Sequence, residues 1–107
     1  MRLPPPVQAF FDADQQGDAL APLGAFANSA AVKDEGRTHT GHSAIADWWR
    51  TSKAKYSHIS EPRETNEVGN RITVLAQVSG RFPGSPSLLS FTFTLDDNHI
   101  LVLEIGA

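Results

Sequence analysis

The chain has 107 residues, 40% of them hydrophobic and 20% charged, with a formal net charge of −3 and no cysteine. A chain of this length buries about two-thirds of its unfolded surface, so we expect residues 1–107 to form a single domain. The basic residues are scattered and form no basic face, which argues against nucleic acid as a partner. Without cysteine, disulfides, thiolate nucleophiles and metal sites built on sulfur are all excluded.

The amino-terminal stretch MRLPPPVQAFF does not resemble a signal peptide, because prolines interrupt its apolar residues. The longest apolar run, residues 100–103, is far too short to span a membrane. We therefore expect a cytoplasmic protein that does not bind membranes.

The first half of the chain carries helical patterns. Residues at intervals of three and four form one face of a first helix that ends at Gly17: Val7, Phe10, Phe11 and Asp14. A second, shorter helix follows, for which Asp18 is a suitable cap. Its apolar side holds Leu20, Leu23 and Phe26. Gly41 then precedes a third helical pattern in residues 43–56.

The third helix has two different faces. Its apolar side holds Ile45, Trp48, Trp49, Ser52 and Tyr56. The residues left for water are Asp47, Arg50, Lys53 and Lys55. Adjacent residues on a helix point about 100° apart, so at most one of the two tryptophans can lie fully inside a cavity.

The remaining segments indicate strands. Residues 31–40 read as an extended segment in which Gly36 is a bulge or a bend. Residues 57–68 are polar and contain Pro62, which is typical of an edge strand. Further strands are expected in residues 71–82, 88–95 and 99–105. The expected inward side chains of the first two are Ile72, Val74, Ala76, Val78 and Phe82, then Leu89, Phe91, Phe93 and Leu95. Helices followed by a meander of strands predict an α+β fold.

The last expected strand, HILVLEI, is apolar on both faces. One face can pack in the core of the domain, and the other can be buried against a second copy of the chain. We therefore expect a homodimer through the outer sheet face, with Leu101, Leu103 and Ile105 or their neighbours contributing. The alternative is that the amino-terminal arm folds across that face.

Three pieces of sequence occur in a characteristic order: a first helix ending in Gly17-Asp18, the stretch A-x-V-x-D ending at Asp34, and the pattern G-x-x-A-I-x-x-W from Gly41 to Trp48. In this order the chain resembles the ketosteroid-isomerase-like, NTF2-like superfamily, which includes the SnoaL-like polyketide cyclases. The resemblance covers roughly the first half of the chain. It implies a cone-shaped, curved antiparallel sheet packed on about three amino-terminal helices, a cystatin-like or NTF2-like α+β barrel. Its cavity would accept a small apolar molecule.

Asp34 stands where the resemblance places a general base. A carboxylate close to aromatic rings is partly desolvated, which raises its pKa toward the range useful for taking a proton from carbon. The run Asp34-Glu35-Gly36 fits a turn equally well, and Asp34 would then have no chemical role. His39 could act as a proton donor, or pair with Asp34 if the chain bends at Gly36; otherwise it is a polar strand residue.

The resemblance fails at the groups that stabilise an enolate. By alignment, the two donor positions of the isomerases hold Phe10 and Phe91, and their supporting tyrosines fall on Phe26 and Trp49. Because phenylalanine donates no hydrogen bond, steroid isomerisation is not expected. Acid–base chemistry on a polyketide, with Asp34 and His39, is the better enzymatic interpretation.

A cone that is wide at one end cannot be filled completely by its own side chains, so a subset of the aromatic residues should line a pocket. The residues expected there are Phe10, Phe26, Trp49, Tyr56, Phe91 and Phe93. Of the two adjacent tryptophans, the alignment favours Trp49 as the one that lines the pocket. The histidines show no recognised metal-ligand spacing, so we expect no metal, and the chemistry needs no cofactor.

The sequence therefore predicts that the protein binds a small apolar molecule in a conical cavity. Acid–base catalysis by Asp34 and His39 is one form of this prediction. The alternative is a ligand-binding or dimerisation module of the same fold that has no catalytic activity.

Overall fold

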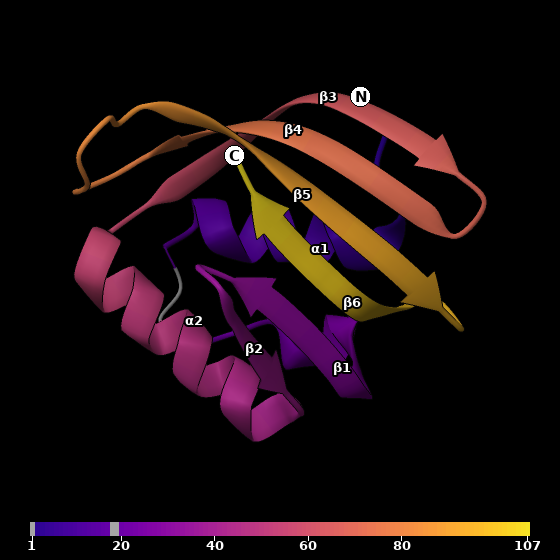
Figure 1. The fold of residues 1–107 in the computed structure, drawn as a ribbon. Helices are drawn as coiled ribbons and strands as arrows, with labels where there is room; N and C mark the ends of the chain where they lie inside the picture. Colours follow the sequence, from indigo (N-terminus) through magenta and orange to yellow (C-terminus); the bar gives the residue numbers. More distant parts are fainter. Residues whose placement is uncertain (1, 18–19) are drawn as a thin grey trace.

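The computed structural model describes residues 2–17 and 20–107, so the capping role expected of Asp18 lies outside the described residues. The elements follow in this order: α1 (Pro5–Gln15), the 3₁₀ turn η1 (Leu23–Ala25), β1 (Phe26–Asp34), β2 (Arg37–Thr40), α2 (His42–Tyr56), β3 (Ile59–Val68), β4 (Arg71–Ser79), β5 (Ser87–Asp96) and β6 (His99–Gly106). The strands of this described part form one curved sheet in the order β2-β1-β6-β5-β4-β3 (Figure 1). The predicted α+β class and curved sheet are confirmed.

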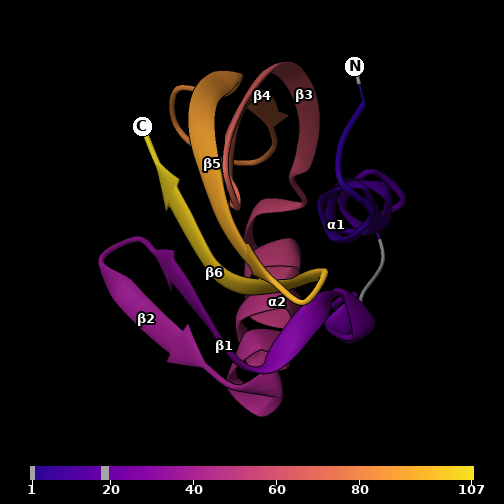
Figure 2. The ribbon, with the colours of Figure 1, turned by 90° about the vertical axis from the view of Figure 1, so that its right-hand side faces the viewer.

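The sheet is open, with β2 and β3 as its edges. It curls strongly, and α1 lies on its concave side (Figure 2). Strands β1 and β6 run parallel, whereas the other neighbouring pairs within the described ranges are antiparallel. A parallel pair needs a long crossover, which here contains α2 and four strands. The sheet is therefore mixed and not wholly antiparallel.

Helix α1 buries the face that its spacing predicts: Val7, Phe10, Phe11 and Asp14. The expected second helix is reduced to the 3₁₀ turn Leu23–Ala25. Pro22 and Gly24 both disfavour an α-helix, and Phe26 already begins β1.

Residues 31–40 fold back on themselves as the end of β1, a tight turn and β2. Glu35 and Gly36 form the turn with positive φ angles of 53° and 75°, the conformation that matches the twist of paired strands. Val32 pairs with His39 across the two strands, and Asp34 pairs with Arg37. Cross-strand partners share a face, as do residues two apart on one strand, so the bend puts Asp34 and His39 on the same face.

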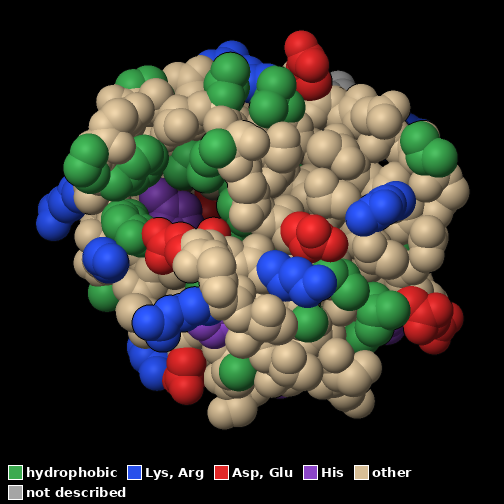
Figure 3. Space-filling model, viewed as in Figure 1, with side chains coloured by type: hydrophobic (Ala, Val, Ile, Leu, Met, Phe, Trp, Pro, Cys, Tyr) green, Lys and Arg blue, Asp and Glu red, His purple; other side chains and the backbone are tan. Residues whose placement is uncertain are grey.

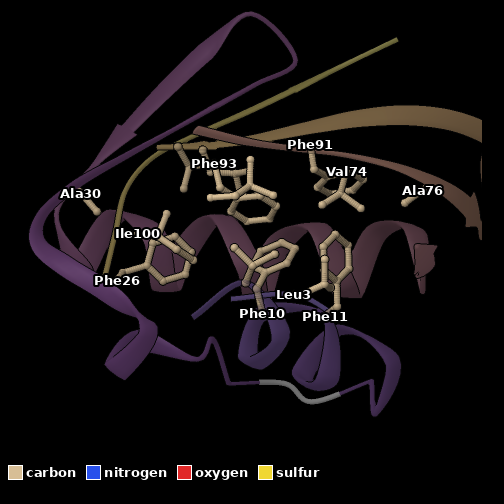
Figure 4. Packing of buried hydrophobic residues seen from close by; sticks show 14 of the residues in the cluster. Leu3, Phe10, Phe11, Phe26, Ala30, Val74, Ala76, Phe91, Phe93 and Ile100 are labelled. Carbon is tan, nitrogen blue, oxygen red and sulfur yellow. The ribbon is translucent and has the colours of Figure 1, made fainter. Parts of the chain in front are cut away.

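Aromatic rings of α1 pack against the concave face of the sheet (Figure 4). The Phe10 ring lies 5.4 Å from Phe93 and 5.5 Å from Trp49 between centroids, edge to face. The expected inward side chains of β4, Ile72, Val74, Ala76 and Val78, are all buried. Phe82 differs, because β4 ends at Ser79 and Phe82 lies in the following loop.

Two of the expected outward positions of β6 need correction. Leu103 is fully buried in the core, and Ile105 also faces inward. The pairing of β5 with β6 shifts between Thr94 and Leu95, which changes the alternation of the strand. The outer face of β6 carries Val102 and Glu104, which pair with the outward residues Thr94 and Thr92 of β5. Neither helix in the described ranges is long and apolar enough to cross a bilayer.

Candidate functional site

A cavity of about 250 Å³ lies between α2, the turn after β1, the start of β3 and the inner face of the sheet. Ten of its wall residues are apolar or aromatic: Phe10, Trp48, Trp49, Tyr56, Val78, Phe82, Pro83, Leu89, Phe91 and Ile105. The polar wall residues are Asp14, Asp34, Glu35, Ser52, His58 and Ser60. In the space-filling view, hydrophobic, histidine and acidic side chains gather around a hollow beside the carboxyl-terminal end of α2 (Figure 3).

The Asp34 carboxylate is half-buried on this wall. The indole Nε1 of Trp48 donates a hydrogen bond of 3.0 Å to Asp34 Oδ2. Burial raises the pKa of Asp34 above its ordinary value, and the Trp48 hydrogen bond opposes that shift without cancelling it. Among residues 2–17 and 20–107, no basic side chain lies within ion-pair distance of this carboxylate. Asp34 is both the residue before a turn and a cavity residue, and its chemical role stays a prediction.

His39 does not reach the cavity wall. Its ring lies 6.2 Å from the Trp48 ring, between centroids, on the exposed strand β2. The hairpin does put His39 on the same face as Asp34, but Trp48 takes the hydrogen-bonding position at the carboxylate. The expected placement of His39 in the cavity is therefore not seen.

Of the aromatic residues expected to line a pocket, Phe10, Trp49, Tyr56 and Phe91 do so. Phe26 and Phe93 are instead buried in the core, where both rings pack against Phe10 of α1. Both tryptophans contact the cavity: Trp49 is 2% exposed, and Trp48 is half-buried with its N–H on Asp34.

The second polar group on the wall surrounds Asp14, whose role the sequence analysis missed. Lys53 Nζ donates to Asp14 Oδ1 at 2.8 Å, and the Ser60 backbone N–H donates to Oδ2 at 2.6 Å. His58 Nε2 lies 3.4 Å from Oδ1. Burial alone would raise the pKa of Asp14, but the contacts with His58 and Lys53, the Lys53 charge and the Ser60 N–H hold it below its ordinary value. We call these four residues the Asp14 cluster.

A signal for this cluster was present in the sequence. Asp14 continues the apolar face of α1, and a carboxylate at a core position is rarely buried without a partner. Lys53 is that partner, so its expected exposure to water was wrong. Its ammonium group also donates to the backbone oxygens of Asp14, at 2.9 Å, and His58, at 2.8 Å. With three acceptors, Lys53 has no donor left for a ligand.

The solvent side of the cavity is closed in part by a contact between α2 and the hairpin turn. Tyr56 donates its hydroxyl hydrogen to Glu35 Oε1 at 2.7 Å. The Tyr56 ring also packs edge to face on Phe82, with 6.0 Å between centroids. Within the described ranges, no three histidine or acidic side chains gather in a way that could hold a metal ion.

The sequence matches no protein-family model, and it matches no curated protein. Among solved structures, a proposed polyketide cyclase from Sinorhizobium meliloti is 46% identical over 96% of this chain and 94% of its own, with a TM-score of 0.92.

Two more distant structures share the fold. A protein with a ketosteroid-isomerase-like fold from Catenulispora acidiphila, in complex with trimethylamine, is 19% identical over 99% of this chain and 87% of its own, with a TM-score of 0.85. A SnoaL-like protein of unknown function from Burkholderia thailandensis is 15% identical over 92% and 88%, with a TM-score of 0.77. The chain thus belongs to the NTF2-like, SnoaL-like superfamily that its sequence motifs predicted.

Proposed function

We propose that the protein binds a small apolar molecule in the cavity and that Asp34 takes a proton from a carbon atom of that molecule. The observation that carries this proposal is the half-buried Asp34 carboxylate on a wall of aromatic rings, with its pKa raised by burial. A carboxylate that water solvates poorly is a stronger base than an exposed one. The aromatic walls suit the flat body of an apolar ligand.

The hydrogen bond from Trp48 supports a defined geometry for the step. It engages Asp34 Oδ2, and no described residue donates to Oδ1, so Oδ1 is the proton acceptor. The proton moves from a C–H group beside a carbonyl to Oδ1, and the electrons of the broken bond pass to the carbonyl oxygen as an enolate. His39 does not line the cavity, so we assign it no contact with the ligand.

The chemistry of the wall favours a carbon acid that is already activated. Phe10 and Phe91 both line the cavity and cannot donate a hydrogen bond to an enolate oxygen. When a carbon flanked by two carbonyl groups loses a proton, the negative charge is shared by two oxygens. Such an enolate therefore needs fewer hydrogen-bond donors to stabilise it. Polyketides contain such carbons, which agrees with the name of the relative from Sinorhizobium meliloti.

Hydrogen exchange on a model ketone tests the proposal without knowledge of the natural substrate. 2-Tetralone is a bicyclic ketone with acidic C–H groups, and its exchange in D₂O can be followed by NMR. We expect the protein to accelerate this exchange, and Asp34→Asn to lower the acceleration by about 100-fold or more, the usual share of a general base.

Asp47→Asn is the matched control, because Asp47 lies on the exposed side of α2 and pairs only with Arg50 in the described structure. It removes the same charge outside the cavity and should leave the exchange rate unchanged. Equal rates for the wild type and Asp34→Asn would contradict the proposed role of Asp34.

The missing donors also favour a second candidate function, binding without turnover. In that case 2-tetralone should perturb the Trp48 and Trp49 indole resonances while its exchange rate stays at the value in buffer. Accelerated exchange that depends on Asp34 would exclude this candidate.

A further inference from the structure

The Asp14 cluster contains two polar atoms that have no hydrogen-bond partner. Among residues 2–17 and 20–107, His58 Nδ1 and Ser60 Oγ are the buried side-chain polar atoms in this condition. Ser60 is fully buried, and both residues belong to the cavity wall. Unpaired buried polar atoms are rare, because each one lowers stability. Their place on the wall suggests that the missing partner is a group inside the cavity.

The rest of the cluster is fully engaged and holds these two residues in place. Lys53 neutralises Asp14, and its three N–H groups donate to three oxygens. Ser60 is fixed by its backbone, since its N–H donates to Asp14 and its carbonyl accepts from Gln15 Nε2 at 3.0 Å. The backbone that carries the two unpaired atoms is therefore held in place.

The two atoms differ in hydrogen-bonding character. Asp14 is ionised, since its pKa is lowered, and its Oδ1 lies on the Nε2 side of the His58 ring. A neutral imidazole then carries its proton on Nε2, which leaves Nδ1 as an acceptor. The Ser60 hydroxyl keeps an unused donor. An acceptor and a donor on the same wall match a hydroxyl group, which both donates and accepts, whereas a carbonyl oxygen only accepts.

We propose that His58 and Ser60 form a hydroxyl-binding subsite, so that the ligand carries an alcohol or phenol group at this end. The Ser60 hydroxyl can turn toward the cavity by rotation about the Cα–Cβ bond, which leaves its backbone hydrogen bonds intact, while the His58 ring keeps Nε2 on Asp14. The inference rests on the proposed function, because it concerns the orientation of a ligand in the same cavity.

The two polar groups of the wall contact different parts of α2. Trp48 holds Asp34 and Lys53 holds Asp14, and these residues are five positions apart on α2. Five helical residues rise about 7.5 Å along the helix axis, so the two polar groups lie at different levels of the cavity wall. The proposed ligand is therefore a flat, apolar molecule with a hydroxyl group at one end and the reacting carbon at the other.

A matched pair of probes tests the subsite: 2-naphthol and 2-methylnaphthalene. They carry a hydroxyl group and a methyl group, respectively, at the same ring position. Dissociation constants can be measured from the indole N–H resonances of Trp48 and Trp49, which both line the cavity. We expect 2-naphthol to bind about tenfold more tightly than 2-methylnaphthalene, and Ser60→Ala to reduce this preference to about threefold or less.

Ser43→Ala is the control, because Ser43 is an exposed serine of α2 that does not line the cavity. It should leave the tenfold preference unchanged. A second readout is the ¹⁵N resonance of His58 Nδ1, which should shift with 2-naphthol and stay constant with 2-methylnaphthalene.

The outcomes separate this inference from the proposed function. If both probes bind equally well to the wild type, or if the preference survives Ser60→Ala, the subsite is overturned while the cavity remains a binding site. If neither probe binds, the proposed function is overturned together with the subsite.

Discussion

Asp14 on α1 and Lys53 on α2 form a buried ion pair, with 2.8 Å between Oδ1 and Nζ and side chains only 2% and 9% exposed. Lys53 also reaches the backbone oxygen of His58, just before β3 begins. The pair therefore ties two helices and one strand together at the polar wall of the cavity. It holds His58 and Ser60 in place and takes no direct part in the proposed proton transfer.

Lys53→Met should destabilise the protein strongly. The substitution leaves the Asp14 carboxylate buried beside a hydrocarbon chain, and loss of one partner from a buried pair costs about 3–5 kcal/mol. Urea denaturation measures the change in the free energy of unfolding. Lys55→Met makes the same replacement at an exposed position of α2 and should change stability little. Equal stabilities of the two variants would show that the ion pair contributes nothing.

Asp14 should govern acid stability. Its pKa in the folded state lies below the ordinary value of 3.8, so the folded state binds this proton less readily than the unfolded state does. The stabilisation is complete above that ordinary value and is lost as the pH falls through the lowered folded-state pKa.

Urea denaturation from about pH 6 to about pH 2 should therefore show a steeper loss of stability for the wild type than for Asp14→Asn. Asp12→Asn, an exposed position on the same helix, should keep the wild-type slope. A wild-type slope in Asp14→Asn would contradict this assignment.

Gly80→Ala should disturb the start of β3. A methyl group at Gly80 would lie 2.7 Å from the backbone oxygen of Tyr56 and 2.9 Å from His58 Cα. Backbone atoms cannot move aside easily, so we expect a loss of about 1–3 kcal/mol and weaker discrimination between the naphthalene probes. Gly24→Ala, where nothing lies within 4 Å, is the control. Wild-type stability in Gly80→Ala would argue against this close contact.

Self-association through the outer sheet face remains a prediction. The outward side chains of β4 and β5 are mostly uncharged and of medium size, among them Thr73, Leu75, Thr92 and Thr94. We propose that two copies pack these faces together. Sedimentation equilibrium should detect a dimer, and Thr92→Arg should shift it toward monomer, whereas Gln8→Arg on α1 should not. A wild-type monomer at every concentration would contradict the proposal.

Most of the fold could be predicted because its signals are local. The spacing of Val7, Phe10 and Phe11 indicates a buried helix face, and the alternation around Phe91 and Phe93 indicates a buried strand face. The parallel pairing of β1 with β6 could not be predicted in this way. It joins segments about 70 residues apart, and periodicity carries no information on which strands become neighbours.

The candidate site was predicted only in part for the same reason. Asp34 was found because a motif of the superfamily contains it, and Trp49 because the alignment places it at the position of a supporting tyrosine. Lys53 was assigned to solvent because lysine usually is exposed, and its partner Asp14 lies on another helix. His39 was expected in the cavity because the bend at Gly36 could be anticipated, but the position of Trp48 between the two groups could not.

The most direct test of Asp34 as the proton acceptor compares two titrations on the wild-type protein. The exchange rate of 2-tetralone is measured against pH, and the ionisation of Asp34 is followed by its side-chain ¹³C carboxyl resonance. Because only the carboxylate can take a proton, the rate should rise with pH as Asp34 ionises. Both curves should share one midpoint above 3.8, since burial raises the pKa of Asp34. An exchange rate that does not follow the Asp34 titration would contradict this role.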